Sequence, residues 1–158
     1  MEAALRTAYE LKTGERLGKV DLDPVRGLGG IREAEIEVGG SPIRVAVAHG
    51  LSNARQLLEH VAEAKQRGET PYHFIEIMAC RGGCIGGGGQ PIDNSMRQRE
   101  ERIRGLYRED TERPIRRSHE NPEIKEIYAR YLHEPGSELA HRLLHTHYMR
   151  RDPYSQAV

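Results

Sequence analysis

The two cysteines of this 158-residue chain, Cys80 and Cys84, lie four positions apart in one short segment. A disulfide between them would close a very small loop and stabilise the fold little, because the entropy that a cross-link removes grows with loop length. Thiolates at this spacing also suit metal coordination, and both zinc and an iron–sulfur cluster accept them. We therefore expect the two thiols to serve chemistry rather than cross-linking.

Six glycines accompany the thiols between Met78 and Pro91. Glycine costs about 0.5–1 kcal/mol relative to alanine inside a helix or strand, so this run predicts a loop. Glycines beside thiolates let the backbone approach an inorganic cluster and direct amide N–H groups at its sulfides. A phosphate-binding loop is also glycine-rich, but the Gly-Lys-Ser/Thr that completes it is absent here. Arg81 adds a positive charge that favours the thiolate form of its neighbours.

A strand and a helix are predicted to position this loop. Residues 74–78 predict a short strand that leads into Cys80, and ligand sites favour the carboxyl ends of strands in α/β sheets. The preceding helix is predicted with Ser52 as its N-cap and Gly68 as its stop, from apolar residues at helical spacing: Leu51, Ala54, Leu57, Leu58, Val61 and Ala62.

Upstream, the pattern predicts a short helix and then a β-hairpin with one buried face. The helix is indicated by Ala3, Ala4, Leu5, Ala8 and Leu11, and it should stop before Thr13-Gly14. The hairpin is indicated by alternating residues on either side of Gly39-Gly40: Ala34, Ile36 and Val38, which alternate with glutamates, then Ile43, Val45 and Val47.

After Pro91, arginine, glutamate and histidine dominate and short helices are predicted at 95–110, 122–132 and 138–147. Asn121 can cap the middle helix, and Pro122 suits its first turn. Narrow apolar stripes and Pro-containing links indicate a helical belt that wraps another body. The fold class is therefore mixed α+β, with a hairpin, helices and a short strand followed by a helical C-terminal region.

The glycine-rich segment resembles the third cluster-binding signature of iron-only ([FeFe]) hydrogenases. The resemblance is carried by Glu76-x-Met78-Ala79-Cys80-x-Gly82-Gly83-Cys84-x-x-Gly87-Gly88-Gly89-Gln90-Pro91. It implies that Cys80 binds a [4Fe–4S] cubane and that Cys84 both binds this cubane and bridges it to a two-iron subcluster. Met78 would pack beside the two-iron unit, which together with Cys84 makes it a catalytic-site residue. The resemblance also implies the cofactor-binding glycines, namely Gly82, Gly83, Gly87 and Gly88.

The resemblance extends over most of the chain. The upstream stretches that are similar to these enzymes include residues 2–10, 25–28 and 45–51. Two later stretches, 118–122 and 143–148, resemble the region that forms a separate small subunit in some hydrogenases. We therefore expect residues 1–91 to be the C-terminal part of a large-subunit catalytic domain and residues 92–158 to be a small-subunit-like helical region.

Two other signatures of the family have no counterpart here: Thr-Ser-Cys-Cys-Pro and Pro-Cys-x-x-Lys. They hold the remaining two cubane ligands, so the resemblance implies an H-cluster completed by a partner subunit or segment. We expect this chain to be inactive alone, as a split subunit or as the product of an internal start or a broken reading frame. Reversible H2 oxidation and proton reduction would need the partner, with a ferredoxin-like protein exchanging electrons.

Composition limits the alternatives. Lys and Arg number 24 against 24 Asp and Glu, with the signs interspersed, so we expect no nucleic-acid partner. No apolar stretch approaches the roughly 20 residues that span a bilayer, and the mixed N-terminus has no signal-peptide layout, so we expect a cytoplasmic protein. Two other hypotheses stay open: a non-catalytic relative of the hydrogenase-like iron–sulfur assembly factors, and a structural subunit with inert thiols.

Overall fold

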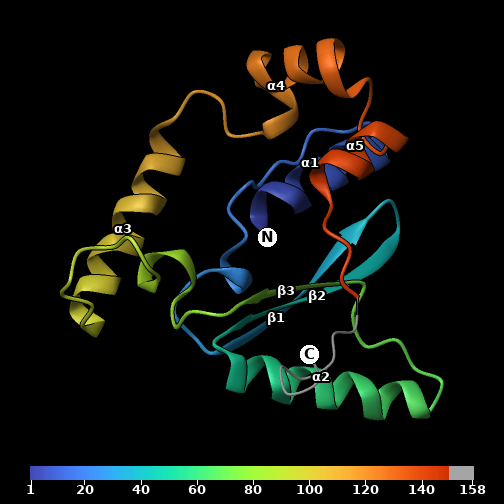
Figure 1. Cartoon of the computed structure of the whole chain (residues 1–158). Coiled ribbons are helices and arrows are strands. Elements are labelled where there is room, and N and C mark those ends of the chain that lie inside the picture. The colour runs from blue at the N-terminus through green and yellow to red at the C-terminus, as the bar shows by residue number, and fades with distance from the viewer. Residues whose placement is uncertain (150–158) are drawn as a thin grey trace, which may run out of the picture. The chain divides into compact units, whose positions relative to one another are not determined.

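The computed structural model describes residues 1–149, so the end of the predicted second region, residues 150–158, lies outside the described part. The chain forms two compact units that divide between Ser118 and His119. The first unit contains helices α1 to α3 and all three strands of the described residues, and the second contains α4 and α5 (Figure 1). This mixture of helices with a small sheet confirms the predicted α+β class.

The sheet has three strands in the order β1-β2-β3. Strands β1 (Ile31–Val38) and β2 (Ser41–His49) form the predicted antiparallel hairpin. Its turn is Gly39-Gly40, with φ values of +59° and +79°, which side chains disfavour and a tight hairpin turn requires. Strand β3 (Phe74–Met78) runs parallel to β2, with Met78 opposite His49.

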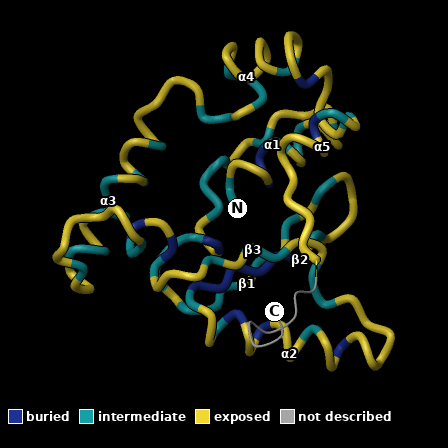
Figure 2. The backbone as a smooth tube through the Cα atoms, in the orientation of Figure 1, coloured by how far each residue is buried: buried dark blue, intermediate teal, exposed yellow. Residues whose placement is uncertain are grey.

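Helix α2 (Leu51–Gln66) connects the two parallel strands and covers one face of the sheet (Figure 1). Its Ala54 and Leu57 pack on Ala46 and Ala48 of β2. The prediction of one buried face is therefore wrong for β2, because both of its faces are buried. Its alanines lie under α2, and the alternation of residues did not reveal that this helix covers them. Figure 2 shows this strand as the most continuous buried segment of the unit.

The ends of α2 differ in how well they were predicted. Ser52 is not the N-cap, because the helix begins at Leu51 and its N-cap is Gly50, which has no side chain to accept from the first turn. The predicted stop is confirmed. Gly68 has a φ of +76° and donates its N–H to the Lys65 carbonyl at 3.0 Å, just after the helix ends.

Helix α1 (Glu2–Thr13) lies over the opposite face of the sheet (Figure 1). It ends at Gly14 (φ +71°), close to the predicted stop, and packs Leu5 against Val25, Val45 and Val47. Its other buried residue is Arg6, whose guanidinium is bound to Asp110 through contacts of 2.8 and 2.9 Å. The inward side of α1 is therefore largely ionic, which its apolar pattern did not predict.

Asp110 belongs to α3 (Met96–Glu112), which begins at the capping side chain of Ser95. Besides Arg6, its carboxylate accepts from Arg26 at 3.0 Å and from Arg116 at 2.6 Å. Hydrogen bonds from Arg6, and then from Arg116, hold the pKa of Asp110 well below its usual range, against the opposing effect of burial. The result is an ion network that fixes α3 to α1.

The second unit begins with α4 (Pro122–Ile127), capped by the Asn121 side chain, which accepts the Glu123 N–H at 2.9 Å as predicted. The predicted helix continues to Leu132, although its last part, Tyr128–Leu132, is π-helical. Helix α5 (Glu138–Leu144) ends three residues before the predicted His147.

Candidate metal centre

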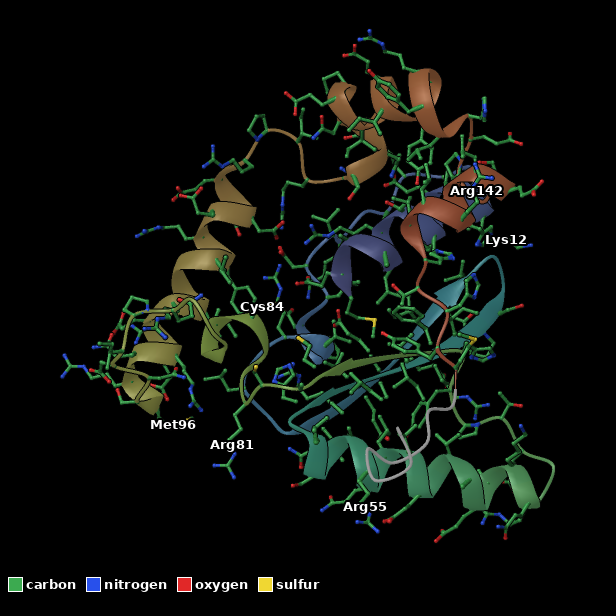
Figure 3. All side chains as sticks on the ribbon, in the orientation of Figure 1. Lys12, Arg55, Arg81, Cys84, Met96 and Arg142 are labelled. Atoms are coloured by element: carbon green, nitrogen blue, oxygen red, sulfur yellow. The ribbon has the colours of Figure 1, made fainter. Side chains whose placement is uncertain are left out.

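The two cysteines lie in the loop between β3 and α3, directly after the carboxyl end of β3 (Figure 3). Both side chains are exposed free thiols. The Gly83 N–H donates to the Cys80 carbonyl at 3.0 Å, which starts a 3₁₀ turn over Gly83–Gly86 that contains Cys84. The backbone is thus folded back between the thiols, while their sulfur atoms stay accessible.

Two glycines of the predicted set are required by this backbone. Gly82 and Gly83 have φ values of +78° and +70°, a region that side chains rarely adopt. A Cβ atom at Gly83 would also lie 2.6 Å from the Met78 sulfur, which is closer than real contacts allow. A side chain at Gly83 would therefore require the Met78 side chain to move.

Gly87 has a different role, because it keeps one thiol uncovered. A Cβ atom at Gly87 would lie 3.3 Å from the Cys80 sulfur, whereas one at Gly88 would meet nothing within 4 Å. The tightest position is Gly86, where a Cβ would lie 2.0 Å from the Arg81 carbonyl oxygen. Sequence analysis did not include Gly86 among the site residues, since this backbone approach leaves no signal beyond the glycine itself.

Helix α3 holds the far side of the loop. The Asn94 amide donates to the Gly86 carbonyl at 2.9 Å, and the Arg102 guanidinium donates to the Ile85 carbonyl at 3.0 Å. Arg102 also reaches the Asp93 carbonyl at 2.7 Å. Because Ile85 is only 6% exposed, the turn is fixed by burial as well as by hydrogen bonds. Figure 3 shows Arg81 extending outward from this loop.

A cavity of about 310 Å³ lies beside Cys84 and is also lined by Met78, Arg32, His49 and Glu76. His49 is 5% exposed, and burial, followed by the nearby charge of Arg32, lowers its pKa, so the imidazole is held neutral. Burial likewise lowers the pKa of Arg32. Within the described part of the chain, Arg32 Nε, Arg32 Nη1 and His49 Nδ1 are buried without a hydrogen-bond partner.

Sequence analysis missed Arg32 and His49 as residues of this site. The sequence does give an indication for Arg32, because it lies two residues before Ala34 and four before Ile36. Residues at this spacing in a strand share one face, and in β1 that face is not exposed. An arginine on that face indicates a buried cation. His49 ends a buried strand, and only the parallel pairing with Met78 places it beside the loop.

The donor set fits an iron–sulfur cluster as a partial site. Both thiols are accessible, and Gly87 has no side chain that would crowd the Cys80 sulfur. The cavity beside Cys84 also holds buried nitrogen atoms without partners. These features suit an anionic group with sulfide surfaces. Among residues 1–149, no three His, Cys, Asp or Glu side chains converge to hold a metal ion.

Comparison with known proteins agrees with this chemistry. Residues 1–88 match the family described as "Iron only hydrogenase large subunit, C-terminal domain", and residues 96–151 match "Iron hydrogenase small subunit". The chain belongs to the iron-only hydrogenase family. The resemblance noted in the sequence is thereby confirmed, from the hairpin and cluster loop through to the C-terminal helices.

Several hydrogenases are similar over nearly the whole chain. The NADP-reducing hydrogenase subunit HndD of Solidesulfovibrio fructosivorans is 53% identical over 96% of this chain, and iron hydrogenase 1 of Clostridium pasteurianum is 39% identical over 94%. A solved structure of the [FeFe]-hydrogenase HydA1 from Chlamydomonas reinhardtii superimposes with a TM-score of 0.71 at 43% identity, covering 94% of this chain and 43% of that one.

A second group of relatives is also similar. Cytosolic iron–sulfur assembly component 3 of Bos taurus is 36% identical over 94% of this chain and is matched over 30% of its own length. The chain spans about a quarter of the length of the two hydrogenases named first, 25% and 26%. No helix among residues 1–149 combines the length and apolar character that a membrane crossing needs.

Proposed function

We propose that this chain is the C-terminal part of an [FeFe]-hydrogenase and that it supplies Cys80 and Cys84 to the catalytic iron–sulfur cluster. The observation that carries the proposal is a pair of exposed thiols in a glycine-rich loop, one before and one within its 3₁₀ turn. The chain that holds them belongs to the iron-only hydrogenase family. The complete enzyme would interconvert dihydrogen with two protons and two electrons.

The residues of the loop have distinct roles in this proposal. Cys80 and Cys84 would hold the [4Fe–4S] cubane, and Cys84 would also be the ligand shared with the two-iron subcluster of the H-cluster. Met78 packs against the two-iron side and makes that wall apolar. The predicted binding glycines let the backbone come close to the cluster: Gly82, Gly83, Gly87 and Gly88. When bound, the H-cluster supplies the redox and hydrogen chemistry, and the protein supplies ligation, orientation and charge.

The assembly that follows contains more than this chain. A cubane takes four protein ligands, and only two are present here, so a subunit or segment with the other two cysteine signatures must join residues 1–91. Residues 92–158 form the small-subunit-like region. A ferredoxin-like protein is the proposed electron partner, in the cytoplasm.

The proposal is tested on the native assembly, purified through an affinity tag on this chain. We expect viologen-linked H2 oxidation and infrared bands from iron-bound CO and cyanide, both absent from a Cys84→Ser assembly. Iron without these bands or the activity would favour the second candidate, a non-catalytic assembly-type relative, which the identity to the Bos taurus protein supports. Full activity in the Cys84→Ser assembly would leave the thiols inert and overturn the proposal.

The lone chain gives a complementary test. With two thiolates per molecule, reconstitution with iron and sulfide should yield no stoichiometric, stable [4Fe–4S] signal in the EPR spectrum after reduction. A stable signal of one cluster per chain would show that the outside ligands are not needed.

A further inference from the structure

Arg32 is a partly buried cation of the first unit. It lies in β1 opposite Val47, a residue that is 2% exposed. Its Nε and Nη1 atoms are buried and have no hydrogen-bond partner among residues 1–149. Buried nitrogen atoms without hydrogen-bond partners are unfavourable, so these two atoms favour an anionic group in the space beside them.

The charged and polar groups around the same cavity are engaged elsewhere. Glu76 accepts a hydrogen bond from the Met1 amino group at 3.1 Å, and Glu2 accepts from Arg26 at 2.9 Å. The Tyr107 hydroxyl accepts the Gly27 N–H at 2.7 Å. His49 is held neutral by burial and by the Arg32 charge. Glu76 attracts Arg32 through space, and neither buried nitrogen of Arg32 has a hydrogen-bond partner among residues 1–149.

The cavity that Arg32 lines is the one that Cys84 and Met78 line. We propose that Arg32 is a positioning residue for the cluster: its guanidinium compensates the negative charge at the Cys84 side and raises the reduction potential of the bound [4Fe–4S] unit. This inference rests on the proposed function, because it needs a cluster at Cys84. A thiolate-ligated cluster gains negative charge on reduction, so a nearby cation in a low-dielectric site stabilises the reduced state.

The experiment is an EPR-monitored redox titration of the tagged native assembly. Arg32→Gln removes the charge, Arg32→Met does so with an apolar side chain, and Arg32→Lys retains it. The matched control is Arg55→Gln, since the Arg55 side chain is 81% exposed on α2 and pairs with Glu59 one helical turn away. A merely structural role of Arg32 would change yield or stability without moving the potential.

We expect both neutral variants to lower the reduced-to-oxidised ratio of this cluster about tenfold at a fixed potential. For a one-electron couple that is a shift of about 59 mV toward lower potential. Arg32→Lys should retain most of the wild-type potential, and Arg55→Gln should not change it. If neither neutral variant assembles, a tenfold change in the Arg32→Lys assembly, which keeps the charge, would overturn the inference.

The outcomes separate this inference from the proposed function. A wild-type assembly without iron at the cysteine loop would overturn both. Iron at the loop with an unchanged potential in Arg32→Gln and Arg32→Met would overturn only the inference. If those variants instead weakened binding of the segment that completes the cluster, with the potential unchanged, the guanidinium would pair with a carboxylate of that segment and not with the cluster.

Discussion

Gly83 and Met78 are packed so closely that a Cβ atom added at Gly83 would lie 2.6 Å from the Met78 sulfur. Met78 is the last residue of β3, and Gly83 opens the 3₁₀ turn that holds Cys84. The side chain at the end of the strand therefore fixes the path of the backbone between the two thiols.

Gly83→Ala tests this packing. The alanine should destabilise the protein by about 1–3 kcal/mol through overpacking and by about 1–2 kcal/mol through its left-handed backbone conformation. In a Met78→Ala background the clash disappears, so only the backbone cost should remain. Denaturant unfolding of both single variants and the double variant measures the difference. An equal cost of Gly83→Ala in the two backgrounds would contradict the contact.

Gly86→Ala should be worse tolerated than any neighbouring glycine substitution in the turn. The added Cβ would lie 2.0 Å from the Arg81 carbonyl oxygen, a backbone atom that cannot rotate away. We expect a loss of several degrees in the thermal midpoint, by the scale of about 2–4 °C per kcal/mol for a chain of this size. Gly88→Ala is the control, because nothing lies within 4 Å of its Cβ position. Similar midpoints for the two variants would refute the close approach.

Asp110→Asn should break the ion network between α1 and α3. The Arg6 side chain, 4% exposed, would lose its charged contacts with Asp110 and keep the 3.4 Å contact with Glu2, so we expect a cost of about 1–3 kcal/mol. Asp23→Asn provides the control. Its carboxylate pairs at the surface with Lys19, and that pair should contribute little to the free energy of unfolding. Equal effects of the two substitutions in denaturant unfolding would argue against a buried network.

The same carboxyl group predicts how stability depends on pH. The pKa of Asp110 is lower in the folded protein than its ordinary value of 3.8, through hydrogen bonds from Arg6 and then Arg116. Its stabilisation is therefore complete above pH 3.8 and is lost as the pH falls below that value toward the folded pKa. Thermal midpoints from about pH 6 to about pH 3 should fall less steeply in Asp110→Asn. Parallel curves for the two proteins would contradict this assignment.

The local elements of the first unit could be predicted because each depends on a short stretch of sequence. Gly39-Gly40 marks the hairpin turn, and residues 74–78 favour a strand by their own residue types, independent of their neighbours in the fold. The prediction of Ser52 as the cap is wrong because a serine near a helix start is a good cap by type, whereas the connection from β2 begins the helix two residues earlier than that cap requires, at Leu51.

The tertiary features could not be predicted from local patterns. Ala46 and Ala48 are small and ambiguous in sequence, and only the packing of α2 buries them. Arg6 lies among the apolar residues of α1, and its burial depends on Asp110, 104 positions away. The cysteine loop could be predicted because its residue types are those that a cluster needs, while Arg32 and His49 reach the site only through strand pairing.

The central claim is that Cys80 and Cys84 hold an iron–sulfur cluster, and cluster content is its most direct test. Iron, sulfide and the reduced EPR spectrum should be measured on the tagged native assembly and on one that carries Cys80→Ala and Cys84→Ala. Because these are the chain's only cysteines, the difference between the two isolates the contribution of this loop. We predict that the variant loses the iron and sulfide of one cluster together with its signal. Unchanged iron in the variant, or zinc in place of iron in the wild type, would contradict the claim.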